Sequence, residues 1–180
     1  MVFGWFRKKP HEAVIARLHG EIMAQARNPV LFTDYGVADT PEGRFEMVAL
    51  HVLAAVRGLA AQPEPGPELA QELTDAMFTH VDIAFREMGV SDTTVPKRMK
   101  KYASAWLGRA RVYGSALDAG DAAELAKALA RNVHGEVETT PAEAHRLARY
   151  LMALEKSCRA ASLAPFAEGP PPAIDPASIT

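Results

Sequence analysis

The stretch "MVALHVLAAV" at positions 47–56 decides the fold, because almost every residue in it is apolar. It lies within a longer helical pattern, in which Thr40 is a good N-cap and Pro41 suits the first helical position. We therefore predict one helix over residues 41–61. A helix that is apolar nearly all round has to be covered by other elements on several sides. We expect it in the middle of a helical bundle.

The segments on either side of this helix also space their apolar residues as helices do. Prolines, glycines and capping residues separate them, and no segment shows the alternation that is typical of a strand. Further helices are predicted over residues 11–27, 68–88, 94–117, 121–134 and 140–161, with one short turn near residues 31–36. The sequence thus predicts an all-α fold, a single-domain bundle of about six helices with short loops.

Composition divides the chain into three parts. Residues 11–162 form the helical domain. Residues 1–10 combine aromatic and basic side chains, and we expect a flexible N-terminus there. Residues 163–180 contain "GPPPAIDPASIT", which predicts a disordered, proline-rich tail.

Overall composition excludes several classes of protein. The net charge of −2 and the pI near 6.3 exclude a general binder of polyanions, so such binding would need a local patch. Cys158 is the single cysteine, which excludes an internal disulfide and fits a reducing compartment. No apolar stretch reaches the roughly 18–20 residues of a membrane-spanning helix, and the start lacks the order of a signal peptide. We expect a cytoplasmic protein.

The predicted helix over residues 94–117 contains "VPKRMKKYASAWLGRARVY", with six cations and no acid. At about 100° per residue, an apolar stripe falls on one side of this helix and the cations fall broadly on the other. The stripe consists of Met99, Tyr102, Ala103, Trp106, Ala110, Tyr113 and Leu117, and the cations are Lys97, Arg98, Lys100, Lys101, Arg109 and Arg111. We interpret the stripe as the side that packs on the core.

The cations call for a separate explanation. Four of them lie in the first two turns, where the helix dipole disfavours each cation by roughly 0.3–1 kcal/mol. A sequence shaped by stability alone would place acids there, or would alternate the signs of the charges. The arrangement favours a binding surface for acidic protein segments, membrane headgroups or RNA. A merely solvated face is the alternative.

The N-terminal "FGWFRKK" places Phe3, Trp5 and Phe6 beside three cations. Aromatic rings and cations together suit the interface of an anionic membrane. The alternatives are a weak membrane contact and a terminus without a partner.

The sequence contains no recognisable catalytic or metal-binding motif. His11 and His19 lie eight positions apart rather than in the His-Glu-x-x-His spacing, and His51 reads as a hydrogen-bonded core residue. Cys158 lies on a packing face, which favours an inert thiol, and no Gly-rich phosphate loop is present. The residues predict a binding protein rather than an enzyme, without cofactor or metal.

Two stretches resemble the signatures of a known family. Residues 31–52, "LFTDYGVADTPEGRFEMVALHV", resemble the aromatic-Thr-Asp-x-Gly-Val-x-Asp-Thr-x-x-Gly-Arg-Phe signature of the ubiquinol–cytochrome c chaperone family. Residues 85–109, "FREMGVSDTTVPKRMKKYASAWLGR", resemble its second signature, Arg-Glu-Met-Gly-Val-x-Asp followed by Lys-Arg-x-Lys-Lys. Pro96 departs from the residue expected there, which a first helical turn tolerates. At lower stringency the resemblance covers residues 15–159.

The resemblance implies an assembly factor of the respiratory bc1 complex, of the bacterial type. Mitochondrial relatives act on newly made cytochrome b near the ribosome exit and the inner membrane, together with a small partner protein. For this chain it implies nascent cytochrome b as the client and residues 11–162 as the chaperone domain. It also implies a cytoplasmic location, peripheral at the inner membrane. The ribosome, and an anionic membrane surface met through the N-terminus and the basic helix, are further candidate partners.

We expect two groups of residues to bind these partners and to border one surface. One group is the set of six cations given above. The other group comes from residues 31–45 and consists of Phe32, Asp34, Tyr35, Asp39, Arg44 and Phe45. The aromatic residues of this second group are expected to be exposed and to hold a client helix, and Arg44 is expected to anchor Asp34 or Asp39.

Two other functions fit the same residues. One is a ribosome- or RNA-binding module that uses the basic helix and has no direct client. The other is an enzyme or haem-handling protein, which would require a deep pocket that brings His51 together with buried carboxylates.

Overall fold

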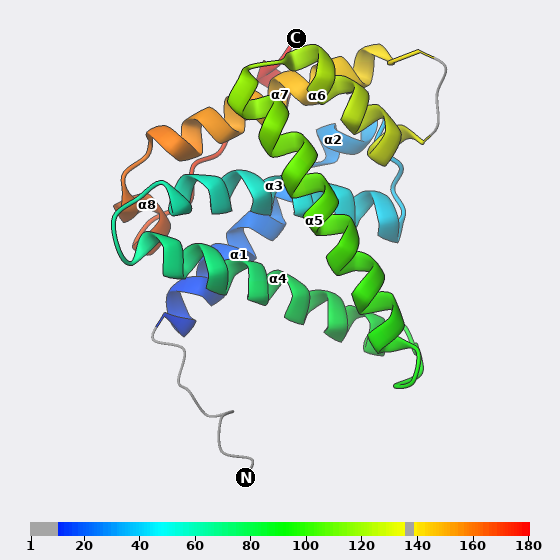
Figure 1. Cartoon of the computed structure of the whole chain (residues 1–180), viewed down its shortest axis with the longest axis vertical. Helices are drawn as coiled ribbons and strands as arrows, with labels where there is room; N and C mark the ends of the chain where they lie inside the picture. Colours follow the sequence, from blue (N-terminus) through cyan, green and yellow to red (C-terminus); the bar gives the residue numbers. More distant parts are fainter. Residues whose placement is uncertain (1–10, 136–138) are drawn as a thin grey trace.

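The computed structural model describes residues 11–135 and 139–180, so the predicted N-terminal segment 1–10 lies outside the described residues. Within these ranges the chain is helical and has no strand, which confirms the predicted all-α fold (Figure 1). The α-helices are α1 (Glu12–Ala26), α2 (Pro29–Thr33), α3 (Pro41–Ala60), α4 (Gly66–Glu87), α5 (Val95–Ala119), α6 (Ala122–Leu129), α7 (Ala142–Ala160) and α8 (Leu163–Ala167). A π-helical turn (Ala130–His134) extends α6, and a 3-10 turn (Pro176–Ser178) follows α8. The long helices match the predicted ones. α2 overlaps the short turn predicted near residues 31–36, and α8 is a five-residue helix that the sequence did not predict.

The apolar helix lies at the centre of the bundle, as predicted. α3 packs against α1, α4 and α7, and α5 crosses in front of it in Figure 1. Residues 47–55 are buried without interruption. The hydroxyl of Thr40 accepts a hydrogen bond from the Gly43 N–H at 3.1 Å, so the N-cap that starts this helix is the predicted one. Near the other end, α3 approaches α7 so closely that a Cβ on Gly58 would lie 2.7 Å from the Cys158 carbonyl oxygen.

His51 is the polar residue at the centre of this core, and it is 2% exposed. Its Nδ1 lies 2.7 Å from the Met47 carbonyl oxygen and its Nε2 lies 2.7 Å from the Tyr150 hydroxyl. Burial lowers the pKa of His51 to about 4. The interpretation of His51 as a hydrogen-bonded core residue is therefore confirmed.

The prediction of a disordered tail over residues 163–180 is wrong. Phe166 and Pro176 are buried, and α8 packs on α1. Arg17 donates to the carbonyl oxygens of Phe166, at 2.6 Å, and of Gly169. Prolines lack an N–H but keep a carbonyl acceptor, so side-chain donors of the bundle can hold such a segment without regular secondary structure. Proline content alone was a misleading sign of disorder.

Candidate partner-binding surface

α5 has the apolar side that its periodicity predicts. Trp106, Tyr113 and Ala116 are buried in the main core. At the start of the helix, Val95 joins Val81 and Phe85 of α4 in a second, smaller cluster. The predicted stripe therefore packs inward, and the opposite side of α5 faces solvent.

The solvent side of α5 carries what we call the basic face. Its cations are exposed and form no ion pair with any residue of the described ranges 11–135 and 139–180. Leu107 lies among them with 68% of its surface exposed. The basic face consists of Lys97, Lys100, Lys101, Ser104, Leu107 and Arg111. Sequence reasoning missed Leu107, although a leucine on the polar side of an amphipathic helix was a visible signal.

The start of α5 does nothing to offset these charges. Thr94 occupies the N-cap position but makes no side-chain capping bond, and the first turn contains no acid. The positive end of the helix dipole and the lysines thus share one end of α5, which makes it an electropositive surface.

Two of the six cations predicted to bind partners, Arg98 and Arg109, are not part of the basic face. Arg98 is exposed, but its guanidinium lies 5.5 Å from the centre of the Phe85 ring, so it partly covers α4. Arg109 is wrongly predicted as a solvent-facing residue: its Nε donates to Glu46 Oε2 at 2.6 Å, and its Nη2 donates to Glu46 Oε1. Arg109 follows Trp106 by three positions and precedes Tyr113 by four, so helical geometry places it on their side.

The pair of Arg109 and Glu46 ties α5 to α3 near the centre of the molecule. The Glu46 residue is 8% exposed. Burial raises the pKa of the Glu46 carboxyl, and the Arg109 guanidinium opposes that rise. A charged pair in this position holds the two helices in register and is not free to meet a partner.

Tyr35 is also wrongly predicted as an exposed aromatic residue. It is fully buried, and its hydroxyl donates to the Pro176 carbonyl oxygen at 2.7 Å. The Arg146 guanidinium lies 4.5 Å from the centre of its ring, and the Tyr150 ring meets it edge-on at 5.9 Å. Burial raises the pKa of the Tyr35 hydroxyl. Tyr35 fastens the tail to the bundle, a role that no local pattern in the sequence could reveal.

The two other predicted aromatic residues in the segment 31–45, Phe32 and Phe45, are half-buried. Phe32 packs against the main core, and Phe45 contacts Tyr102 of α5 edge-on, with ring centres 4.5 Å apart. The end of this segment therefore contacts the packing side of α5, and the expectation that the two groups border one surface stays a prediction. Tyr35 lies against α7 and the tail instead.

The charged residues of residues 31–45 are exposed and shape the turn before α3. Arg44 donates to both carboxylate oxygens of Asp39, at 2.6 and 3.2 Å, and these bonds lower the pKa of Asp39. Asp34 accepts a hydrogen bond from the Thr33 hydroxyl at 2.5 Å and lies 4.0 Å from Arg146. Arg44 thus anchors Asp39 rather than Asp34.

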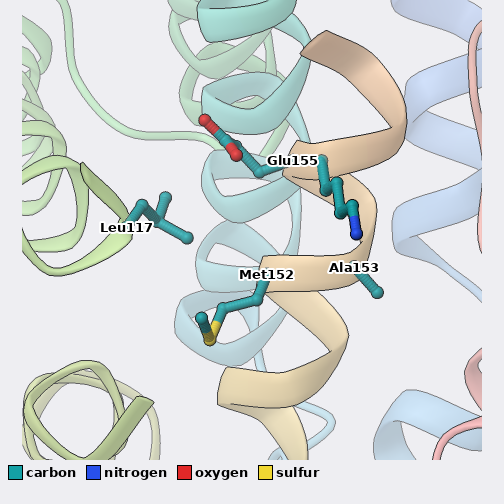
Figure 2. Close-up of a pocket in the computed structure, with 5 residues that line it drawn as sticks. Leu117, Met152, Ala153 and Glu155 are labelled. Carbon is teal, nitrogen blue, oxygen red and sulfur yellow. The ribbon is translucent and has the colours of Figure 1, made fainter. Parts of the chain in front are cut away.

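Two open hollows flank the second half of α5. The first, of about 300 Å³, lies between α5 and α7; in Figure 2, Leu117 reaches from one side while Met152 and Glu155 project from the other. The second, of about 250 Å³, has Arg109, Arg111 and Arg131 in its lining. Neither is lined by His51, so these hollows give no support to a haem-handling site.

No helix among the described residues is both long enough and apolar enough to cross a membrane.

Known proteins resemble the chain over most of its length. It matches the family model described as ubiquinol-cytochrome C chaperone over residues 33–173. No curated protein matches it significantly. The crystal structure of the Cbp3 homolog from Brucella abortus is similar to it, with 38% sequence identity and a TM-score of 0.85, and the match covers 94% of this chain and 93% of that chain. The chain therefore belongs to the ubiquinol–cytochrome c chaperone family.

Proposed function

We propose that this protein is an assembly chaperone for the cytochrome bc1 complex, and that it binds newly made cytochrome b at the membrane surface. The family match over residues 33–173 carries the proposal. On this proposal the protein acts by binding its client, and the match to a chaperone family supports such a role.

The basic face is the part of the surface that suits an anionic membrane. Each lysine or arginine close to anionic lipid contributes about 1 kcal/mol, so the four cations of the basic face contribute about 4 kcal/mol together. Leu107 adds an apolar side chain that can enter the headgroup region. Binding of this strength is reversible, as a chaperone that releases its client requires.

Residues at the start of α3 suit contact with the client. Arg44, Asp39 and Asp34 are exposed, and Phe32 and Phe45 each present part of an aromatic ring. Because Phe45 touches Tyr102, a client segment bound here would lie beside α5. Membrane docking and client binding would then take place on neighbouring surfaces.

Charge reversal of the basic face tests the membrane contact. We compare the wild-type protein with the triple variant Lys97→Glu, Lys100→Glu, Lys101→Glu. The control, Arg27→Glu, Lys127→Glu, Lys156→Glu, makes the same change of charge at exposed positions outside α5. Flotation with anionic vesicles should recover the wild type and the control but not the triple variant, and vesicles of neutral lipid should recover none. Equal flotation of all three proteins would exclude the basic face as the docking site.

Recovery of cytochrome b tests the client contact separately. Tagged wild-type protein should retain cytochrome b from detergent-solubilised membranes of a bacterium that assembles a bc1 complex. Arg44→Ala should reduce this recovery while leaving the fold intact, because Arg44 is exposed and pairs only with the exposed Asp39 among the described residues. Absence of cytochrome b from the wild-type sample would contradict the proposed client.

A ribosome-binding role is the second candidate, since the exposed cations of the basic face also suit RNA phosphates. It predicts cosedimentation with ribosomes that weakens steeply as salt rises and is lost in the triple variant. Ribosome binding without recovery of cytochrome b would favour this candidate over the first.

A further inference from the structure

Three side chains with metal-binding atoms meet where α1 and α4 begin. His11 is the residue immediately before α1, and Glu68 and Glu72 lie in the first two turns of α4. One ligand atom of each lies within 4.8 Å of the others. The two glutamates are four positions apart on a helix, so both reach the same side of α4. This cluster is separate from the basic face and from residues 31–45.

Two atoms of the cluster are buried without a hydrogen-bond partner. Glu72 is 8% exposed, and its Oε2 accepts no hydrogen bond. His11 Nδ1 is also buried and unpartnered. The two residues approach most closely at 3.5 Å, between His11 Nδ1 and Glu72 Oε1. A buried carboxylate oxygen and a buried ring nitrogen that lack partners are both costly, and one cation between them would satisfy both.

The backbone around the cluster is firmly held. Leu69 and Leu73, which flank the glutamates on α4, are buried in the main core. The His11 carbonyl oxygen accepts the Ile15 N–H at 2.9 Å, so His11 is joined to the first turn of α1. α1 and α4 pack against each other. The positions of the three residues are thus set by the fold, and only side-chain torsions remain to adjust.

The adjustment required is within the reach of side-chain rotation. Metal–nitrogen and metal–oxygen bonds of about 2.0–2.2 Å in a tetrahedron place two ligand atoms about 3.3–3.6 Å apart. The three ligand atoms now lie within 4.8 Å of one another, so they have to approach by up to roughly 1.5 Å. Glu68 is exposed and can rotate inward, whereas Glu72 is held by its buried surroundings.

We propose that His11, Glu68 and Glu72 bind a divalent first-row transition-metal ion, Zn²⁺ above all, which ties the start of α1 to the start of α4. One imidazole and two carboxylates are ligands that Zn²⁺ accepts, and the fourth position of its tetrahedron remains for water. Two carboxylates balance the charge of a divalent ion beside a neutral imidazole, which suits a largely buried place. The site does not depend on the proposed chaperone function. It escapes motif reasoning because His11 and the two glutamates come from helices far apart in the sequence.

Metal titration of the full chain, freed of metal with a chelator, tests the site. Calorimetry with Zn²⁺ should show one ion bound per chain, and Co²⁺ should give the visible absorption of a low-coordinate complex. His11→Ala, Glu68→Gln and Glu72→Gln should each weaken binding at least about tenfold, since even residues that only support a ligand change metal affinity by 10–100-fold. Glu12→Gln and His145→Ala, which change the same residue types outside the cluster, should bind as the wild type does.

Thermal unfolding adds a second measurement. At one fixed concentration, Zn²⁺ should raise the melting temperature of the wild type and of both controls, and should raise those of the three cluster variants by less. If Glu72→Gln fails to fold, the exposed position makes Glu68→Gln the deciding variant. The site is overturned if the wild type binds no ion in a saturable one-to-one manner, or if the cluster variants bind it equally well.

Discussion

His51 shows how an apolar helix accommodates a polar residue at the level of single atoms. A carbonyl oxygen can only accept, so Nδ1 must donate to Met47. Nε2 then carries no proton and accepts the hydrogen bond of the Tyr150 hydroxyl. One neutral tautomer of His51 therefore satisfies every polar atom at this point of contact between α3 and α7.

The lowered pKa of His51 makes the stability of the fold depend on pH. Burial lowers its pKa from 6.5 to about 4, so between these values the unfolded chain binds a proton that the folded chain does not. Stability should be retained above pH 6.5 and should fall as the pH approaches 4, by up to about 3 kcal/mol. Urea unfolding at several pH values measures this. His51→Gln should show a shallower loss over the same range, and an unchanged slope would refute the assignment.

Arg109 and Arg111 form a matched pair for a second test. Arg109→Ala leaves Glu46 as an unpaired buried charge and should lower the free energy of unfolding by about 3–5 kcal/mol. Arg111→Ala, on the exposed basic face, should change it by less than about 0.5 kcal/mol. Chemical denaturation distinguishes the two variants. Similar effects from both would show that the salt bridge to Glu46 contributes little.

At the scale of the element, α5 combines a stable packing side with an unfavourably charged start. The N-terminal end of a helix prefers acids, yet Lys97 lies in the first turn and Lys100 and Lys101 in the next. The proposed membrane contact explains this arrangement, because lysines that bind anionic lipid need not stabilise the helix.

Lys97→Glu separates these two roles. Replacing a cation by an acid in the first turn should stabilise α5 by about 0.3–1 kcal/mol, while flotation with anionic vesicles should weaken. Thermal unfolding and flotation of the same sample measure both effects. A loss of stability would instead show that Lys97 has a structural contact that offsets the helix dipole.

The same element shows what local pattern predicts and what it does not. Spacing placed Trp106 and Tyr113 on the buried side, because periodicity depends only on helix geometry. The prediction from spacing failed for Arg109. This residue lies on the boundary between the two sides of α5, and we assigned it to the solvent side because of its charge and not because of its angular position around the helix. The prediction failed for Tyr35 because the partner, Pro176, is 141 positions away in the chain. The existence of helices is a local property, and the burial of a particular polar group is not.

At the scale of the whole molecule, the tail joins elements that are far apart in the sequence. α8 packs on α1, and the 3-10 turn lies against α2. Arg146 of α7 donates to the Ile179 carbonyl oxygen at 2.6 Å. The residues that follow α7 therefore close the bundle on the side of residues 31–35.

Removal of residues 169–180 tests whether the tail contributes to stability. The truncated chain loses the bonds from Tyr35 and Arg146 to the tail, and each such hydrogen bond contributes about 0.5–1.5 kcal/mol. The melting temperature should fall, and Tyr35 should become accessible to chemical modification. An unchanged melting temperature would support the disordered tail that composition suggested.

The closure by the tail also has a consequence for biosynthesis. Residues 31–45 leave the ribosome early, but the carbonyl oxygen that receives the Tyr35 hydroxyl belongs to Pro176 and is translated much later. A chain that ends before Pro176 therefore lacks the acceptor of the Tyr35 hydroxyl. The segment 31–45, which carries the first family signature, therefore completes its packing only after Pro176 has been translated, and a pause in synthesis before that residue would delay it.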